Sequence, residues 1–112
     1  MILDAVTKSI ELKLGEAIVT AQLEWILEAA DLLAANASLT AVVTGDGLTN
    51  GVTAVVVLAA PAALHLRQVR LLTVYNADTI PHTVIAQLHS GANIRRYPVQ
   101  TIAPGESYFY GS

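Results

Sequence analysis

The chain contains no cysteine among its 112 residues, which excludes disulfide bridges and thiolate zinc sites. It is also poor in charge: Asp, Glu, Lys and Arg make up 13% of the residues, against about 25% in ordinary domains. Hydrophobic residues account for 54% and aromatic residues for only 5%. A monomer normally covers its surface with more charge than this, so we expect partner proteins to bury part of the exterior.

The few charges are spread unevenly. Residues 1–50 carry seven acidic and two basic side chains, a net charge of −5, whereas residues 51–112 carry two acidic and four basic side chains, a net charge of +2. No stretch is basic enough to bind a phosphate backbone, so we predict no nucleic-acid partner. The opposite signs of the two halves favour head-to-tail contacts between copies, and we predict a homo-oligomer.

No segment is typical of a membrane span or a secretory signal. The longest uncharged apolar stretch, residues 48–66, is interrupted by Gly51 and Pro61 and has no run of about 20 apolar residues. The first residues, Met-Ile-Leu-Asp, lack the basic start of a signal peptide. We therefore expect no membrane association.

Alternating apolar and polar residues predict strands over most of the chain. The segments are 9–14, 17–27, 52–58, 66–75, 83–89, 94–102 and 107–110, and turn chemistry at Asn76–Thr79 and Ala103–Gly105 separates some of them. About seven short strands with turns every 8–12 residues indicate an all-β fold, an antiparallel β-sandwich resembling a jelly roll. We assign this domain to residues 9–112 and expect residues 1–8 to form an extended N-terminal arm.

Residues 17–50 are less clear. The strand pattern continues through about Leu27, but Leu23, Leu27, Ala30 and Ala34 also form a helical stripe in a segment rich in Ala, Leu and Glu. We predict a strand to Leu27 followed by a short helical turn or a loop. Residues 36–50, with Thr-Gly-Asp-Gly at 44–47 and Asn-Gly at 50–51, predict a loop.

The segments 83–89 and 94–102 flank Ser-Gly-Ala-Asn and predict a hairpin. With the turn centred on residues 91–92, opposite positions sum to 183. The predicted pairs are Val84 with Val99, Ala86 with Tyr97, and Leu88 with Arg95.

The sequence shows no constellation typical of catalysis. The histidines at 65, 82 and 89 have no cysteine or carboxylate cluster beside them in the sequence, and the serines lack a Gly-x-Ser-x-Gly motif. Gly45-Asp46-Gly47 is too short for a phosphate loop and lacks its lysine. We predict a non-enzymatic protein without a bound metal or cofactor.

Two apolar segments are candidates for contact with other subunits. An apolar N-terminal segment stays ordered only if something holds it, and an amphipathic aromatic cluster at 108–110 can anchor on a neighbouring chain or close the core. The candidate interface residues are Ile2, Leu3, Val6, Ile10, Leu12, Tyr108, Phe109 and Tyr110. We expect residues 1–12 to bind outside their own domain by strand addition, and the alternative for residues 9–14 is an ordinary edge strand of the same sandwich.

The second half of the chain contains a characteristic order of strand and turn motifs. The motifs are Arg67-Gln-Val-Arg-Leu-Leu-Thr-Val-Tyr-Asn-Ala-Asp-Thr79, His82-Thr-Val-Ile-Ala-Gln-Leu88, the Arg95-Arg96 strand and Thr101-Ile-Ala-Pro-Gly-Glu-Ser-Tyr108. This order resembles small structural proteins of tailed bacteriophages. The resemblance covers roughly residues 50–110, and residues 28–35 depart from the pattern.

The resemblance implies a virion component that is assembled in the bacterial cytoplasm and made in many copies. Its partners would be the major capsid protein or other virion subunits, and a trimer is one option for its homo-oligomer. The expected role is that of a capsid cement or decoration protein, with a neck, connector or tail structural protein as the alternative. A carbohydrate-binding β-sandwich module is a second alternative, although the sequence lacks a loop cluster rich in Trp, Tyr and Asp.

Overall fold

The computed structural model describes residues 1–111, which form two five-stranded antiparallel sheets packed face to face, with no helix in that range. Sheet A contains β1 (Ile2–Leu3), β3 (Glu24–Leu33), β4 (Leu39–Leu48), β6 (His65–Tyr75) and β10 (Ser107–Gly111). Sheet B contains β2 (Lys8–Leu14), β5 (Val55–Leu58), β7 (His82–Ser90), β8 (Asn93–Arg96) and β9 (Gln100–Ile102). The expected all-β sandwich is confirmed, with ten strands rather than seven.

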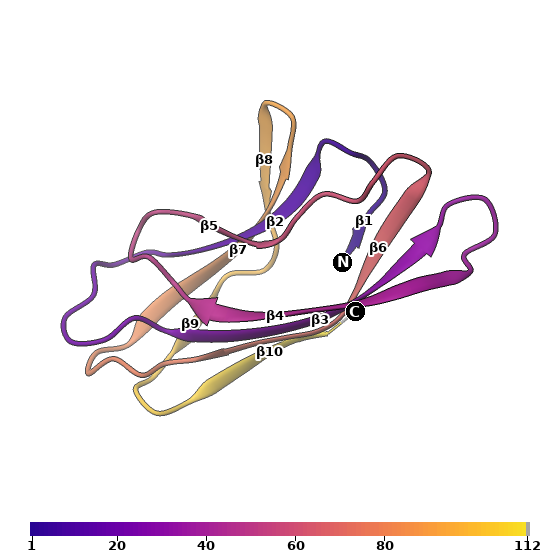
Figure 1. Ribbon diagram of the computed structural model, residues 1–112. Coiled ribbons are helices and arrows are strands. Elements are labelled where there is room, and N and C mark those ends of the chain that lie inside the picture. Colours follow the sequence, from indigo (N-terminus) through magenta and orange to yellow (C-terminus); the bar gives the residue numbers. More distant parts are fainter. Residues whose placement is uncertain (112) are drawn as a thin grey trace.

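Each sheet has two long strands at its centre. In sheet A, β6 and β3 are central, β4 forms one edge, and β1 and β10 share the other side of β6. In sheet B, β2 and β7 are central, β5 forms one edge, and β8 and β9 share the other side of β7. The molecule is elongated, 46 × 27 × 19 Å, and Figure 1 shows the β3–β4 hairpin projecting past the sandwich at one end.

The core lies between the two sheets and consists almost entirely of aliphatic side chains that alternate inward along each strand. Its largest fully buried members are Leu3, Ile10, Leu12, Leu14, Leu23, Leu27, Leu58, Leu72, Val69, Val74 and Val84. The inner side chains of β10 close one border of this core. Tyr108 and Tyr110 pack edge to face with ring centroids 4.7 Å apart, an arrangement that aromatic quadrupoles favour.

Four connections pass from one sheet to the other at the end opposite the projecting hairpin, and we call this the tied end. They are residues 15–23, 49–54, 76–81 and 103–106. Asn76 links two of them: its backbone N–H donates to Glu106 O, and its carbonyl accepts from Gly105 N. Its side-chain amide donates to Ile80 O and Ile102 O. The turn chemistry expected at Asn76–Thr79 and Ala103–Gly105 therefore joins two crossovers.

Two expectations for the first half are wrong. Residues 28–33, expected to be a helical turn or a loop, continue β3, and residues 39–48, expected to be a loop, form β4. The pairing of β3 with both β4 and β6 satisfies its backbone on both sides and overrides the helix propensity of Ala and Leu. Residues 17–23, expected to begin a strand, are one of the inter-sheet connections.

The N-terminal residues do not form a separate arm. Ile2 pairs with Gln68 and Leu3 with Arg67, the side chain of Leu3 is fully buried, and Lys8 already belongs to β2. The reason lies in β6, because β10 pairs only with residues 71–75 and leaves the preceding part of that edge open. β1 fills part of the open edge, and Leu3 gains core burial by doing so.

The hairpin register is confirmed at its tip and wrong at its base. Leu88 pairs with Arg95, and Tyr97 N donates to Ala86 O, as expected. Val84, however, pairs with Gln100 and not with Val99. Pro98 has no N–H to give to the ladder, so the strand is interrupted between β8 and β9 and the register shifts by one residue.

Candidate interaction face

The outer face of sheet A is unusually apolar for a sheet surface. On an antiparallel sheet the outward positions are normally polar, yet here Ile26, Leu48 and Phe109 are each more than half exposed. Tyr75 is 40% exposed on the same face. The register brings them together, since Glu24 lies between Tyr75 and Leu48, and Thr73 lies between Phe109 and Ile26.

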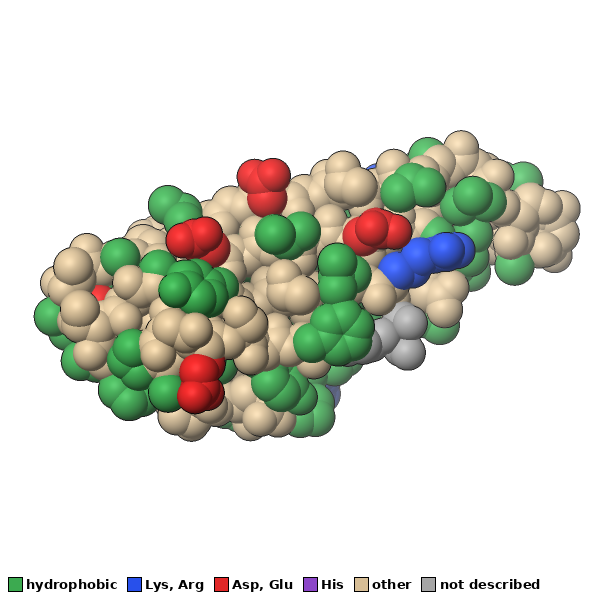
Figure 2. Space-filling model, turned by 90° about the horizontal axis from the view of Figure 1, so that it is seen from below, with side chains coloured by type: hydrophobic (Ala, Val, Ile, Leu, Met, Phe, Trp, Pro, Cys, Tyr) green, Lys and Arg blue, Asp and Glu red, His purple; other side chains and the backbone are tan. Residues whose placement is uncertain are grey.

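Acidic groups are interspersed with these apolar side chains. Glu24 and Glu28 on β3 and Asp46 on β4 are exposed on this outer face. Figure 2 shows the face from below: acidic and apolar side chains alternate across its broad part, and the largest group of basic side chains in view lies towards the narrow end. The broad part therefore offers apolar surface under a negative potential.

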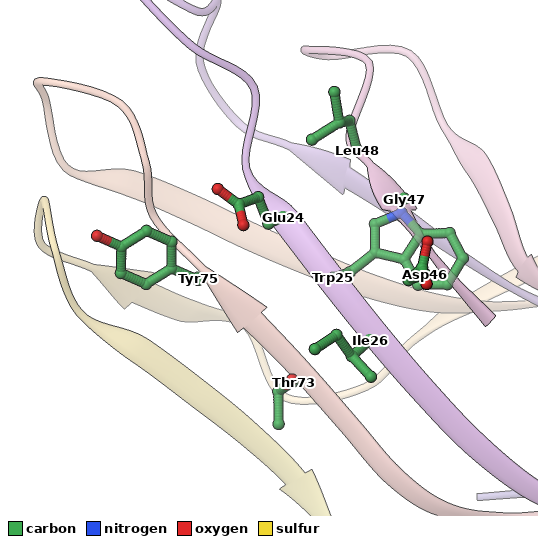
Figure 3. A pocket seen from close by; sticks show the side chains of 8 residues that line it. All are labelled: Glu24, Trp25, Ile26, Asp46, Gly47, Leu48, Thr73 and Tyr75. Atoms are coloured by element: carbon green, nitrogen blue, oxygen red, sulfur yellow. The ribbon is translucent and has the colours of Figure 1, made fainter. Parts of the chain in front are cut away.

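An open groove of about 500 Å³ runs across this face. It is lined by Glu24, Trp25, Ile26, Asp46, Gly47, Leu48, Thr73 and Tyr75, and none of these is basic. Figure 3 shows Tyr75 and Glu24 on one side of the groove, Leu48 and Asp46 on the other, and Ile26 beside Thr73. Carboxylates and hydroxyls around an aliphatic patch suit a partner that brings aliphatic surface together with Lys or Arg.

Trp25 supports this groove from below. Its ring is only 9% exposed and lies against the backbone of Gly45 and Gly47 in β4. A Cβ placed on Gly47 would come within 3.0 Å of the indole, closer than ordinary van der Waals contact. The two glycines that suggested a loop in the sequence thus allow a large ring to pack flat on an edge strand.

A buried polar cluster at the tied end has a structural role. Asp78 Oδ1 accepts from the backbone N–H groups of Thr20 (2.7 Å), Ala21 and Thr79, and Oδ2 accepts from Val19 (3.0 Å). Burial opposes ionisation of Asp78, but these hydrogen bonds outweigh it and hold the pKa of the carboxyl far below its usual value. The carboxylate clamps connection 15–23 onto connection 76–81.

His82 completes this cluster and is fully buried. Its Nε2 lies 2.7 Å from Asp78 Oδ2, and its Nδ1 lies 3.4 Å from Glu16 Oε1 without making a well-directed hydrogen bond. Glu16 itself accepts from the N–H and the hydroxyl of Thr83. The imidazole lies between the carboxylates of Asp78 and Glu16 and is closed to solvent, so this geometry suits a tie between strands.

Two further carboxylates pair with histidines near the surface. Asp31 accepts from Thr40 Oγ1 (2.6 Å) and contacts His65 Nδ1 (2.8 Å) and Arg67 Nε (3.3 Å) in the projecting part of sheet A. On the outer face of sheet B, Glu11 accepts from Gln87 and lies 3.1 Å from His89. Among residues 1–111, no three His, Asp or Glu side chains are placed to hold a metal ion together, and no helix there is long and apolar enough to cross a membrane.

The interface residues proposed from sequence divide into two groups. Ile2, Val6 and Phe109 are more than half exposed and available for contacts, and Tyr108 is half-buried. The others belong to the core of their own domain: Leu3, Ile10, Leu12 and Tyr110. Ile10 and Leu12 are buried because β2 lies in the middle of sheet B, between β5 and β7, and so cannot bind outside the domain.

Sequence reasoning did not single out Ile26, Leu48 and Tyr75, which dominate the outer face of sheet A. A signal was present for Ile26, because it has the parity of Glu24 and Glu28 and not that of Trp25 and Leu27. Its neighbours come from β4 and β6, and only the pairing of those strands reveals the patch.

Comparisons with known proteins give no match for this chain, whether with protein-family models, curated proteins or solved structures.

Proposed function

We propose that the protein is a non-enzymatic structural subunit of a tailed-phage particle, a capsid cement or decoration protein that packs against other virion subunits through the outer face of sheet A. The observation that carries the proposal is the apolar outer face, where Ile26, Leu48 and Phe109 are more than half exposed on neighbouring strands. Exposed apolar groups collected on one sheet mark protein contacts, whereas scattered ones need no explanation.

The chemistry of the face indicates what it contacts. Glu24, Glu28 and Asp46 surround the apolar patch, so the fitting partner presents aliphatic side chains flanked by Lys or Arg. The low overall charge and the resemblance of residues 50–110 to phage structural proteins support the same role. A packing role also agrees with the polar clusters at Asp78 and Asp31, where hydrogen bonds tie strands and connections of the same chain together.

Copy number in the particle tests the proposal. Purified particles of the phage whose genome encodes the chain should contain it in many copies, as measured by quantitative mass spectrometry. An antibody against the purified protein should label the surface of these particles. Absence of the chain from the particles would overturn the proposal.

The contact surface is tested with a matched pair of variants. Ile26 on the outer face of sheet A is 55% exposed, and Val56 on the opposite side of the molecule is 54% exposed. Ile26→Lys should reduce binding of purified protein to particles that lack it by on the order of a hundredfold, because a charge replaces an apolar contact. Val56→Lys should bind as the wild type does. Equal loss in both variants would contradict the assignment of the face.

The groove beside Tyr75 favours carbohydrate binding as a second candidate function. A partly exposed aromatic ring with the carboxylates of Glu24 and Asp46 nearby resembles the mixture of stacking and hydrogen bonding that sugars need. A glycan array decides between the two: specific sugar binding that is lost in Tyr75→Ala favours the module, and no binding favours the structural subunit.

A further inference from the structure

The two sheets present several open strand edges, and most of them are short or protected. β5 and β8 have four residues each, and β8 contains Arg95 and Arg96. β9 has three residues between Pro98 and Pro104, and β10 has five. Short edges, charged side chains and prolines are the usual means of preventing one sheet from pairing with another.

β4 lacks this protection. It has ten residues, no proline and no basic residue, and its single charge is Asp46. Among residues 1–111 it pairs only with β3, and from Ala41 to Leu48 the pairing continues without a register shift. Val42 and Leu48 are 61% and 59% exposed on this strand. A long, apolar, unprotected edge is a template for a further strand.

The pairing with β3 determines which backbone groups are free. Thr49 N donates to Leu23 O, so the pair Leu23–Thr49 is hydrogen-bonded. Hydrogen-bonded and non-hydrogen-bonded pairs alternate along an antiparallel ladder. The N–H and C=O groups of Val43, Gly45 and Gly47 therefore point towards β3. Those of Val42, Thr44, Asp46 and Leu48 point away from it, to the open side.

We propose that β4 pairs antiparallel with β4 of a second copy of this chain, about a two-fold axis that passes through Gly45. A two-fold axis perpendicular to a sheet keeps each side chain on its own face, so opposed residues must have the same parity. The free groups belong to the even-numbered residues, which therefore form the hydrogen-bonded pairs. With the axis at Gly45, Val42 of each copy lies opposite Leu48 of the other copy. Thr44 of each copy likewise lies opposite Asp46 of the other.

This register fits the side chains. The apolar Val42 and Leu48 cover one another, Thr44 lies opposite Asp46, and no acid directly faces an acid. Gly45 would face its own copy in a non-hydrogen-bonded pair, where the backbones approach to about 4.5 Å and a missing side chain is an advantage. The result is one continuous ten-stranded sheet whose apolar outer faces lie side by side. The pairing goes beyond the proposed function, which concerns the outer face of sheet A, and gives a structural form to the homo-oligomer expected from the sequence.

Hydrogen exchange at β4 tests the pairing directly. At concentrations where the protein is dimeric by sedimentation, the amides of Val42, Thr44, Asp46 and Leu48 should exchange at least about tenfold more slowly than in dilute protein. The amides of Val43, Gly45 and Gly47 are already bonded to β3 and should change less. A protein that remains monomeric at 100 µM, or a dimer in which the four even-numbered amides are unaffected, would overturn the inference.

Proline at position 44 supplies the matched variants. Thr44→Pro removes only an outward N–H, as an edge strand tolerates, and should weaken the dimer at least about tenfold. Thr44→Ala keeps that N–H and should dimerise nearly as well as the wild type. Asp46→Asn should tighten the dimer, because the two Asp46 carboxylates lie diagonally across the axis. Equal dimerisation of Thr44→Pro and Thr44→Ala would refute the pairing, and weaker dimerisation of Asp46→Asn would refute the register even if the proline variant does not fold.

The outcome is separable from that of the proposed function. If Thr44→Pro is monomeric but still enriched on phage particles, the edge pairing and the packing role both stand. If the wild type is dimeric through β4 and absent from particles, the pairing stands without the role.

Discussion

The two ends of the molecule use the same chemical group, an aspartate carboxylate, in different ways. At the tied end, Asp78 has a fully buried side chain and is held mainly by backbone N–H groups from two connections. At the projecting end, Asp31 has a side chain that is 13% exposed and is held by the side chains of Thr40, His65 and Arg67. Backbone donors are fixed by the fold, whereas side-chain donors can move away. The difference indicates that the tied end carries stability and that the projecting end is free to adapt.

The largest effect is expected at Asp78. Asp78→Asn keeps the shape but places an NH₂ group against backbone N–H donors, so buried donors lose their acceptor. We expect Tm to fall by more than about 10 °C, measured by thermal unfolding followed by circular dichroism. A loss of only a few degrees would show that the tied end is not the principal clamp.

Asp31→Asn should have a smaller effect, a decrease in Tm of about 2–5 °C in the same measurement. An amide oxygen can still accept from Thr40, and the lost contact with His65 and the lost ion pair with Arg67 lie partly in water, which screens them. Added salt sharpens the contrast: in 1 M NaCl the difference between wild type and Asp31→Asn should shrink, while that between wild type and Asp78→Asn should not. Equal salt sensitivity would contradict the division between side-chain and backbone donors.

Acid titration should give the smallest of the expected differences in stability between the variants at the tied end and at the projecting end. Hydrogen bonds from backbone N–H groups outweigh the effect of burial and lower the pKa of Asp78, and the hydrogen bond from Thr40 lowers the pKa of Asp31. A carboxyl with a lowered folded pKa stabilises the fold above its unfolded value of about 4, and this contribution is lost as the pH falls through the folded pKa. Stability should therefore decrease below about pH 4, less steeply in Asp78→Asn than in Asp31→Asn, by urea unfolding at each pH.

The sequence predicts the strands of the second half of the chain better than those of the first half. From residue 65 onward, strand alternation and turn residues predict where most strands lie, because the signals are local: Leu88 opposite Arg95 follows from the turn length alone. Pro98 shifts the register of the hairpin beyond this pair. The size of such a shift depends on how the following strand pairs, which local signals do not determine. In the first half, local signals misled. Gly45 and Gly47 indicate a loop until Trp25 is known to lie against them.

The candidate face illustrates the same limit. The exposure of Ile26 follows from its parity with Glu24, and the exposure of Phe109 follows from its position between two inward-facing tyrosines. That these side chains share one surface with Leu48 depends on the strand order β10, β6, β3, β4, which is a property of the whole topology. The prediction of an N-terminal arm was wrong for a related reason. The open part of the β6 edge, which accepts β1, exists only because β10 is short.

Trp25 has a further consequence, because it is the only tryptophan in the sequence. Its indole is nearly buried and rests on two glycines of β4, the strand whose other side is open. Indole emission depends on the polarity around the ring, so the intrinsic fluorescence of the chain arises beside the edge strand and the groove. Assembly at that edge, its dissociation on dilution and its local opening can therefore be followed optically, in real time, without attaching a dye to the protein.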